Sequence, residues 1–407
     1  MSNHADEAFS SETQQTPAQW AVRWHGVVFA AALLLSVPVV HLGWHVALGH
    51  EKPALQTRSQ VERPVPTWDG VLAGSWMTKV ENYLREASPI AWWLRGEWNE
   101  WLWCCGILQS DKVQMGRDRW LFLKATLHEH RQQFAREATA RRRFFAEVRD
   151  AVRASGAELV ISLVPDKARV YPDFAFRDGV ISPAKEPIYG MALQEFRELG
   201  IPTADLASAL AVARAAMPGV ALYYARDTHW RPQGALAGAG AVAAAIESLP
   251  VAATLVPRRP AGLGTGSTVS ALGDLVSMLG LLTCELPFGA DRSRTHPLSL
   301  FTTELLEDRE YYSAVLHTDG GTIDPLVSDA GNDIVLLGTS FSEANGAGGL
   351  ALSLGRPVRA ILGHGASGMA PLHTFAAELK RGTKAKVVVW EIVERGLFEV
   401  DWATAQL

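Results

Sequence analysis

The sequence predicts a three-layer α/β domain of flavodoxin-like architecture, with a central parallel sheet, preceded by a single N-terminal transmembrane helix. Three observations lead to this fold class. Strand and helix patterns alternate from residue 143 onward, turns with small or polar residues follow the strands, and residues 26–48 form a long apolar segment. Alternating strands and helices favour a parallel sheet with helices on both faces.

The apolar patterns also give the order of the elements. Connections between parallel strands need a crossover segment, which is usually a helix. The expected helices cover residues 143–155, 187–199, 233–246, 347–354 and 372–381, with an alanine-rich helix after residue 205. The expected strands cover residues 158–164, 201–205, 221–224, 333–337, 358–362 and 385–390.

The 407 residues divide into four regions. Residues 1–25 are a polar tail, residues 26–48 are the expected anchor, residues 49–112 are a linker with a tryptophan-rich segment, and residues 113–407 are the α/β domain. Within this domain, residues 250–331 interrupt the alternation of elements. We expect an insertion there that covers an edge of the sheet or the site.

The apolar segment 26–48 contains no Asp, Glu, Lys or Arg and is long enough to span a bilayer. The alternative is a signal peptide cleaved near small residues such as Ala47 and Gly49. We favour an uncleaved anchor, because the apolar stretch is longer than the usual core of a signal peptide.

Charge and cysteine content argue against two classes of protein. The formal net charge is only −5 and no Lys/Arg tract is present, so we expect no nucleic-acid partner. The three cysteines do not have the spacing of metal ligands, so we expect no metal site. The adjacent Cys104 and Cys105 are expected to be buried or interfacial thiols, with a disulfide to Cys284 as the alternative in an oxidising compartment.

Two segments of unusual composition have competing interpretations. Residues 91–103 contain five tryptophans, which would either pack in the core or form an interfacial or partner-docking surface. The glycine-rich residues 262–266 follow no strand and precede no Lys-Ser or Lys-Thr, so we expect a flexible loop rather than a nucleotide site. Asp274, just after this loop, would lie near the site or cap a helix.

Asp227, His229 and Ser340 together supply the groups of a nucleophilic serine site. A hydroxyl is a weak nucleophile, so it needs an imidazole to accept its proton and a carboxylate to orient that imidazole. Ser340 follows an expected buried strand, and polar residues at the carboxyl ends of parallel strands form ligand sites. Backbone N–H groups of the turn could then receive an oxyanion. The pattern predicts a catalytic triad.

The motifs around these residues resemble the SGNH-hydrolase-like domain of bacterial alginate O-acetyltransferases of the AlgJ and AlgX type. The resemblance lies in residues 222–230, 338–341 and 389–395, with further agreement at residues 116–122 and 164–172, and it covers roughly residues 113–400. It implies transfer of an acetyl group through an acetyl-serine onto an exported polysaccharide. Alginate is the leading acceptor, and cellulose or another exopolysaccharide is the alternative.

The resemblance also implies a setting for the reaction. The anchor would lie in the bacterial inner membrane with the tail in the cytoplasm and the catalytic domain in the periplasm. No bound cofactor is expected, because a multispanning acyltransferase of the MBOAT type would supply the acetyl group, ultimately from acetyl-CoA. A periplasmic carbohydrate acetylesterase and a non-catalytic polysaccharide-binding subunit of an acetylation or secretion complex remain the alternatives.

Further residues are expected to support the triad. On the last strand, Glu391 and Arg395 are expected to form a charge-assisted pair that helps to shape the site, or else a purely structural ion pair. The candidates for oxyanion binding and support are Phe341, Gly363, Gly365 and Asn345, and the candidates for substrate binding are Trp390, Arg395, Tyr171 and Arg169.

Overall fold

The computed structural model describes residues 65–87, 98–99, 101–108, 110–128, 130–279, 305–326 and 333–407. The predicted anchor at 26–48 and Cys284 lie outside these residues. Within the described ranges, no helix is both long and apolar enough to cross a membrane. The chain divides into two compact units, one of residues 1–101 with 283–299 and one of residues 102–282 with 300–407.

In the region predicted to be a linker, the described part of the first unit includes the helices α2 (Trp68–Leu72) and α3 (Ser75–Ala87). The Thr67 hydroxyl begins α2 by accepting a hydrogen bond from the N–H of Gly70 at 3.2 Å. Trp98 and Trp101 stack with their ring centroids 5.2 Å apart and are 60% and 54% exposed. Trp103, in the second unit, is 1% exposed. The tryptophan-rich segment therefore contains both exposed and core residues.

A five-stranded sheet forms the centre of the second unit, with the strand order β4-β3-β10-β8-β9. All its neighbouring strands are parallel. The strands are β3 (Glu158–Val164), β4 (Thr203–Asp205), β8 (Ile334–Gly338), β9 (Arg359–Leu362) and β10 (Val387–Val393). The central β10 is buried throughout because it pairs with β3 on one side and β8 on the other.

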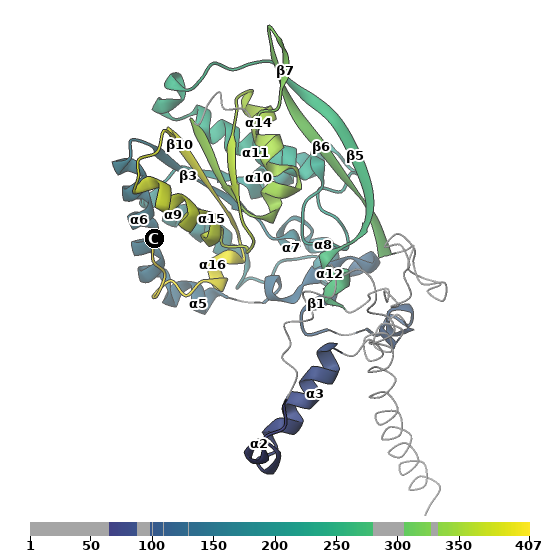
Figure 1. Ribbon diagram of the computed structural model, residues 1–407. Coiled ribbons are helices and arrows are strands. Elements are labelled where there is room, and N and C mark those ends of the chain that lie inside the picture. Colours follow the sequence, from purple (N-terminus) through teal and green to yellow (C-terminus); the bar gives the residue numbers. More distant parts are fainter. Residues whose placement is uncertain are drawn as a thin grey trace, which may run out of the picture. The chain divides into compact units, whose positions relative to one another are not determined.

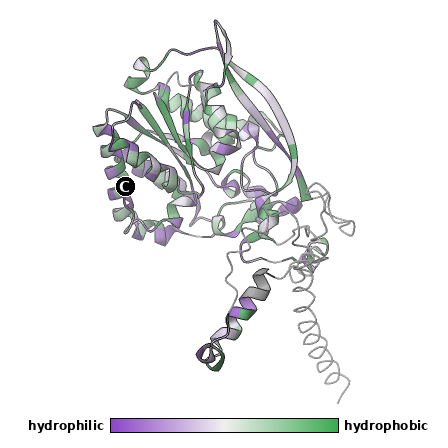
Figure 2. Ribbon diagram, in the orientation of Figure 1, coloured by the Kyte–Doolittle hydropathy of each residue, from purple (hydrophilic) through white to green (hydrophobic). Residues whose placement is uncertain are grey.

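Helices cover both faces of this sheet (Figure 1). One apolar core joins the sheet to α10 (Leu206–Ala216), α11 (Pro232–Glu247) and α14 (Ala347–Leu354). The other joins it to α6 (Ala138–Ala154), α9 (Glu186–Glu198), α15 (Met369–Leu379) and α16 (Gly396–Glu399). Figure 2 shows hydrophobic strands between these helix layers, as expected for a parallel sheet buried on both faces. The predicted three-layer α/β domain is confirmed.

Most predicted elements are present, with small shifts at their ends. The strand at 158–164 and the helix at 347–354 have the predicted bounds. The last strand starts and ends later than predicted, at Val387 and Val393, because its pairing with β3 continues to Val164. The remaining helices and the other sheet strands differ from prediction by a few residues at one or both ends.

Two local predictions were wrong, and a third holds only in part. Residues 221–224 form no strand of the sheet and make only one antiparallel bridge, between Tyr223 and Trp230. Residues 262–266 belong to β5 (Ala261–Leu272), because pairing with β6 (Leu306–Thr318) supplies hydrogen-bond partners that a single segment does not reveal. Cys104 is partly buried and Cys105 is exposed, so the prediction of buried thiols does not hold for Cys105 and the interfacial alternative stays a prediction.

The predicted insertion contains a second sheet. Strands β5, β6 and β7 (Gly321–Ile323) pair in that order and are antiparallel (Figure 1). A short helix, α12 (Asp274–Met278), follows β5 and packs with the hairpin of β1 (Val113–Met115) and β2 (Leu121–Leu123) in a third apolar cluster. Smaller elements complete the unit: η1 (Arg117–Arg119), η2 (Lys124–Thr126), α5 (Arg131–Arg136), α7 (Lys167–Val170), α8 (Pro172–Ala175), η3 (Pro250–Thr254) and η4 (Ser342–Gly346).

Candidate active site

Ser340 lies just beyond the carboxyl end of β8, where the chain turns sharply into the helical segments η4 and α14. Gly338 makes this turn sterically feasible, since a Cβ at this position would lie 2.5 Å from the Cβ of Ser342. The element η4 is a π-helix, a form that occurs frequently at functional sites. The strand thus fixes the turn, and the turn presents the hydroxyl at the edge of the sheet.

Asp227 and His229 lie in a tight loop that precedes α11. The loop is closed by hydrogen bonds from the Tyr224 N–H to the His229 carbonyl at 3.1 Å and from the Arg231 N–H to the Leu222 carbonyl at 2.8 Å. Pro232 then begins α11. The closed loop restricts both polar side chains to one side of the turn.

A continuous hydrogen-bonded chain joins the three predicted site residues. The Nδ1 atom of His229 lies 2.6 Å from Oδ1 of Asp227, and Nε2 of His229 lies 2.8 Å from Oγ of Ser340. An ionised carboxylate only accepts hydrogen bonds, so Nδ1 carries the ring proton and Nε2 is free to accept the serine proton. The structure therefore brings together Asp227, His229 and Ser340 in the order that proton transfer requires.

Asp227 is 1% exposed and its carboxylate is bonded on both oxygens. Oδ1 accepts hydrogen bonds from the backbone and ring of His229, and Oδ2 accepts from the Asp274 N–H at 2.9 Å and from the guanidinium of Arg309. Burial by itself would raise the pKa of Asp227, but the His229 hydrogen bond and the charges of His229 and Arg309 lower the pKa below its usual range. The carboxylate stays ionised at neutral pH.

A tryptophan connects the histidine loop to the serine turn. The indole N–H of Trp230 donates to the Phe341 carbonyl at 3.0 Å, and the Phe341 ring lies 4.8 Å from the His229 ring between centroids. Phe341 is buried, so it supports the imidazole from below. These contacts limit the relative movement of the base and the nucleophile.

Glu391 on β10 fixes the turn before the nucleophile. Its Oε1 accepts hydrogen bonds from the Thr339 N–H at 2.8 Å, the Thr339 hydroxyl at 2.6 Å and the Ser342 N–H at 3.2 Å. Burial raises the pKa of Glu391, although these hydrogen bonds oppose the increase. The predicted pairing with Arg395 is therefore wrong, because the carboxylate points toward β8.

Lys167 holds the loop from the other side. Its buried ammonium donates to the carbonyls of Tyr224, Ala225 and Asp227 at 3.1, 3.2 and 2.8 Å. The same group lies over the rings of Trp120 and Phe122. Burial lowers the pKa of Lys167 to about 7, against the raising effect of Glu307, Asp227 and Asp274.

The oxyanion candidates from the sequence have other bonds. Both amide atoms of Asn345 contact β6, where Nδ2 donates to Glu310 and Oδ1 accepts from Tyr312. The Gly363 N–H donates to the Gly338 carbonyl at 3.0 Å, and the Phe341 N–H donates to the Thr339 hydroxyl at 3.2 Å. The N–H groups of Gly363 and Phe341 are therefore already used, and the amide of Asn345 is bonded to β6. Gly365 begins a loop with φ of +100°, after β9.

Three of the four predicted substrate-binding residues have their side chains bonded to partners inside the protein. Trp390 is fully buried and donates its indole N–H to the Gly368 carbonyl, so it cannot stack on a sugar. Tyr171 is buried and its hydroxyl accepts from the Leu222 N–H at 2.7 Å. The guanidinium of Arg169 is paired with buried Glu394. These three side chains stabilise the loops beneath the site instead.

Arg395 differs from these three. Its side chain is 15% exposed and its guanidinium carbon lies 5.8 Å from the centroid of the Phe341 ring. The neighbouring carboxylates of Asp166 and Glu399 approach its nitrogens only to 3.9 and 3.7 Å. Among the described residues, no acceptor lies within hydrogen-bond distance of this guanidinium, so its donors remain available for an anion.

Sequence reasoning missed Arg309 and the roles of Lys167 and Glu391. Arg309 is separated by 82 residues from Asp227 and lies in the insertion, where no local pattern points to the site. Asp274 was expected either near the site or at a helix cap. Both of its carboxylate oxygens accept hydrogen bonds from Thr228. Only the pairing of β5 with β6 brings these segments to the loop.

Asp227, His229 and Asp274 also have ligand atoms within 4.8 Å of one another. Such a cluster could in principle hold a cation. However, the Asp227 oxygens are bonded to His229, Asp274 and Arg309, and the charge of the guanidinium opposes a second cation at the same carboxylate. The arrangement is better suited to orienting an imidazole than to binding a metal.

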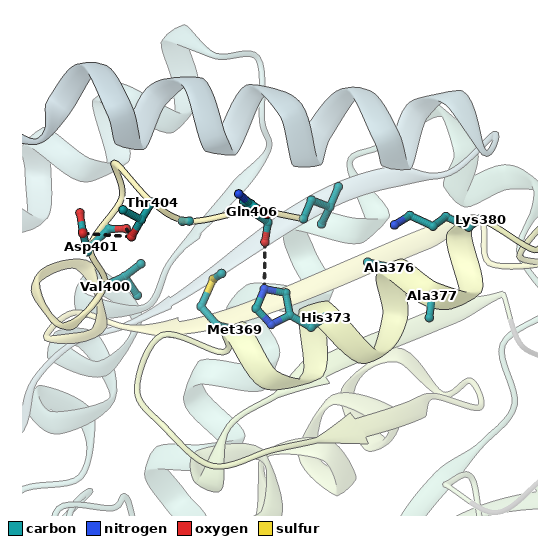
Figure 3. Close-up of a pocket in the computed structure, with 11 residues that line it drawn as sticks. Met369, His373, Ala376, Ala377, Lys380, Val400, Asp401, Thr404 and Gln406 are labelled. Atoms are coloured by element: carbon teal, nitrogen blue, oxygen red, sulfur yellow. Dashed lines mark hydrogen bonds between the residues drawn. The ribbon is translucent and has the colours of Figure 1, made fainter.

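A pocket of about 690 Å³ lies elsewhere, between α15 and the C-terminal residues 400–407 (Figure 3). His373 contacts the Gln406 carbonyl at 2.9 Å across this pocket. None of the residues that line the pocket belongs to the serine, histidine and aspartate chain. The site is therefore identified by its hydrogen bonds rather than by the size of a cavity.

A parallel α/β sheet with a Ser, His and Asp chain at its carboxyl edge is the arrangement of an α/β serine hydrolase-like domain. A family model described as "SGNH hydrolase-like domain, acetyltransferase AlgX" matches residues 113–394. The chain belongs to this family.

Relatives and solved structures agree with this assignment. The chain is 28% identical to the "Probable alginate O-acetylase AlgJ" of Pseudomonas putida over 300 residues, which cover 70% of each chain. It is 27% identical to the Pseudomonas fluorescens protein of the same name, over 80% of this chain and 79% of that one. The fold is similar to the O-acetyltransferase domain of Pseudomonas putida AlgJ, with a TM-score of 0.53, 24% identity and coverage of 70% of this chain and 91% of that chain.

Proposed function

We propose that this protein is an O-acetyltransferase that moves an acetyl group through an acetyl-serine onto hydroxyls of an exported polysaccharide, with alginate as the acceptor. The observation that carries the proposal is the hydrogen-bonded chain from Asp227 through His229 to Ser340. The names of the relatives, which describe probable alginate O-acetylases, support this acceptor.

In the first step His229 Nε2 accepts the proton of Ser340, and Oγ attacks the carbonyl carbon of an acetyl ester. A tetrahedral oxyanion forms, and it collapses as the C–O bond to the leaving group breaks. His229 returns the proton to that leaving oxygen, and an acetyl ester of Ser340 remains. Asp227 stabilises the charged imidazolium throughout this step.

The backbone N–H of Ser340 is the oxyanion donor that we propose. Among the described residues it has no hydrogen-bond acceptor, whereas the next two N–H groups are bonded to Thr339 and Glu391. It also lies at the start of the helical segment after β8, where backbone N–H groups favour negative charge. Backbone donors that are fixed before the reaction stabilise the developing charge without reorganisation.

In the second step His229 removes a proton from an acceptor hydroxyl, whose oxygen attacks the acetyl carbon. Ser340 leaves as the free hydroxyl after it regains a proton from His229. If water took the place of the sugar hydroxyl, the same groups would make an acetylesterase. We favour transfer because the chain belongs to a family described as acetyltransferases.

Arg395 is the residue that we propose to contact an acidic acceptor. Alginate is a polyuronate, and a guanidinium binds a carboxylate through two parallel hydrogen bonds. Arg395 lies against Phe341, next to the nucleophile. Its guanidinium N–H groups have no hydrogen-bond acceptor among the described residues. A neutral acceptor such as cellulose would make no use of this charge.

The setting of the reaction is also part of the proposal. A bacterial inner-membrane anchor at 26–48 would hold the catalytic domain in the periplasm, and a multispanning acyltransferase of the MBOAT type would deliver the acetyl group. Acetyl-CoA is cytosolic, so a periplasmic enzyme needs such a relay. No cofactor would be bound by this chain itself.

A single assay separates the candidate functions. The protein is given an activated acetyl ester with oligomannuronate, with cello-oligosaccharide, or without sugar, and the products are followed by mass spectrometry. Acetylated oligomannuronate supports the proposal, acetate alone supports an esterase, and no turnover supports a binding subunit. Ser340→Ala should abolish transfer, while Arg395→Gln should raise KM for oligomannuronate about tenfold or more with little change in kcat.

A further inference from the structure

We propose that Arg309, carried by the inserted antiparallel sheet, is a positioning residue of this site. Its guanidinium holds the carboxylate of Asp227 in the plane that orients His229. The inference rests on the proposed acyl-transfer function, and it assigns a role in that function to the insertion. Arg309 acts through Asp227 and contacts no reacting atom.

The two oxygens of the Asp227 carboxylate have different partners. Oδ1 faces His229, and Oδ2 accepts from the guanidinium of Arg309 and from the N–H of Asp274. The nitrogen of Arg309 that reaches Asp227 also donates to the Leu272 carbonyl at 3.2 Å, at the end of β5. A carboxylate held on both oxygens cannot rotate away from the imidazole.

Other contacts fix β6 against the same loop. The carboxylate of Glu307 accepts from the N–H groups of Ala225 and Arg226 at 2.8 and 2.9 Å. The Glu310 N–H donates to the Tyr224 hydroxyl at 3.0 Å. On the nucleophile side, Asn345 bonds to the backbone of the same strand. The strand that carries Arg309 is therefore attached both to the loop of Asp227 and to the helix that follows Ser340.

The positive charge of Arg309 compensates the buried negative charge of Asp227. A buried carboxylate is costly unless a cation or several donors satisfy it. His229 cannot supply a permanent charge, because it must alternate between neutral and protonated forms during the reaction. The ammonium of Lys167 bonds to the backbone carbonyl of Asp227 rather than to its carboxylate. Arg309 supplies the constant charge that keeps Asp227 ionised and in place.

The test compares Arg309→Ala and Arg309→Lys with a matched control, Arg359→Ala, in the full chain. Arg359 is a part-buried arginine that pairs with Glu378 on α15, and it has no contact with Asp227 among its described interactions. The first readout is the rate at which a fluorophosphonate reagent labels Ser340. The second is kcat and KM for acetyl transfer, with and without millimolar guanidinium chloride, and circular dichroism reports folding.

We expect Arg309→Ala to lower the labelling rate and kcat by about 10- to 100-fold, with KM for the acceptor unchanged. Arg309→Lys should retain part of the rate. Free guanidinium should restore part of the rate to Arg309→Ala only, because the vacated position at Oδ2 accepts it, and equal sodium chloride should not. Arg359→Ala should label like the wild type.

Two results overturn the inference. One is a folded Arg309→Ala protein that labels at the wild-type rate. The other is an Arg309→Ala protein that labels slowly and is not accelerated by guanidinium, together with an Arg309→Lys protein that labels equally slowly. If Arg309→Ala does not fold, the comparison of Arg309→Lys with the wild type decides in the same way. Failure of the wild type to label or transfer would instead contradict the proposed function itself, which separates the two failures.

Discussion

At the scale of single residues, the site depends on how each polar atom is used. Asp227, His229 and Ser340 form a linear chain of hydrogen bonds, and Arg309 and Asp274 occupy the far oxygen of Asp227. The carboxylate is therefore both ionised and fixed. Orientation of the imidazole, rather than bond formation, is the task of Asp227.

Asp227→Asn tests this division of labour. The amide can still contact His229 but it favours the wrong ring tautomer, so we expect the acetyl-transfer rate to fall by roughly 100- to 10,000-fold. Ser340→Ala and His229→Ala should cost more, because they remove the nucleophile and the base. Asp173→Asn, which breaks the ion pair between Asp173 on α8 and Arg214 on α10, serves as the control and should not change the rate. A larger loss in Asp227→Asn than in Ser340→Ala would contradict the assignment.

At the scale of elements, the site depends on where strands end. β3, β8 and β10 are parallel and adjacent, so their carboxyl ends meet at one edge. β8 delivers Ser340 there, and β10 delivers Glu391 to the back of the same turn. The nucleophile is thus positioned by two strands that are far apart in the chain.

Glu391→Ala is the test of this arrangement. The change leaves the buried N–H and hydroxyl of Thr339 without this acceptor and removes one of the two acceptors of the Ser342 N–H, so we expect the free energy of unfolding to fall by about 2–4 kcal/mol and the labelling of Ser340 to slow. Glu391→Gln keeps an acceptor oxygen and should have a smaller effect. The measurements are urea unfolding and fluorophosphonate labelling.

Glu195→Ala is the matched control for Glu391→Ala. Glu195 is a buried carboxylate paired with Arg141 on the opposite face of the sheet. Glu195→Ala should lower the free energy of unfolding by a similar amount without slowing the labelling of Ser340 in the folded protein. Equal slowing in both variants would mean that Glu391 acts only through general stability.

At the scale of the whole second unit, the active loop joins segments from distant parts of the chain. Lys167 follows β3, the rings of Trp120 and Phe122 come from the N-terminal hairpin, and the loop carbonyls come from residues 224–227. The N–H of Leu121 adds a hydrogen bond to the Ala225 carbonyl at 2.8 Å. Folding of the hairpin and placement of Asp227 are therefore coupled.

The stability of the whole unit should consequently depend on pH through Lys167. Its pKa is lowered from 10.5 to about 7 in the folded protein, so between these values the unfolded chain binds more protons. Stability due to this group must then rise with pH. We expect the difference in unfolding free energy between the wild type and Lys167→Met to shift in favour of the wild type from pH 6 to pH 9, as measured by urea unfolding. A difference that is constant across this range would contradict the assignment.

The sequence by itself determined the alternation of strands and helices, the position of Ser340 after a buried strand, and the pairing of Asp227 with His229 in one loop. These features are local, because hydrophobic periodicity and turn residues act over a few positions. The fold class and the three central residues could be predicted for that reason. The anchor at 26–48 lies outside the described residues and stays a prediction.

Tertiary structure decided the rest. The chain separation between Asp227 and Arg309, and between Thr339 and Glu391, is 82 and 52 residues, so no local pattern could report either contact. The burial of Trp390 and Tyr171 likewise depends on which helices cover the sheet, and it removed two predicted sugar contacts. Hydrogen bonds and desolvation depend on neighbours in space, and only the packed sheet and its insertion supply those neighbours.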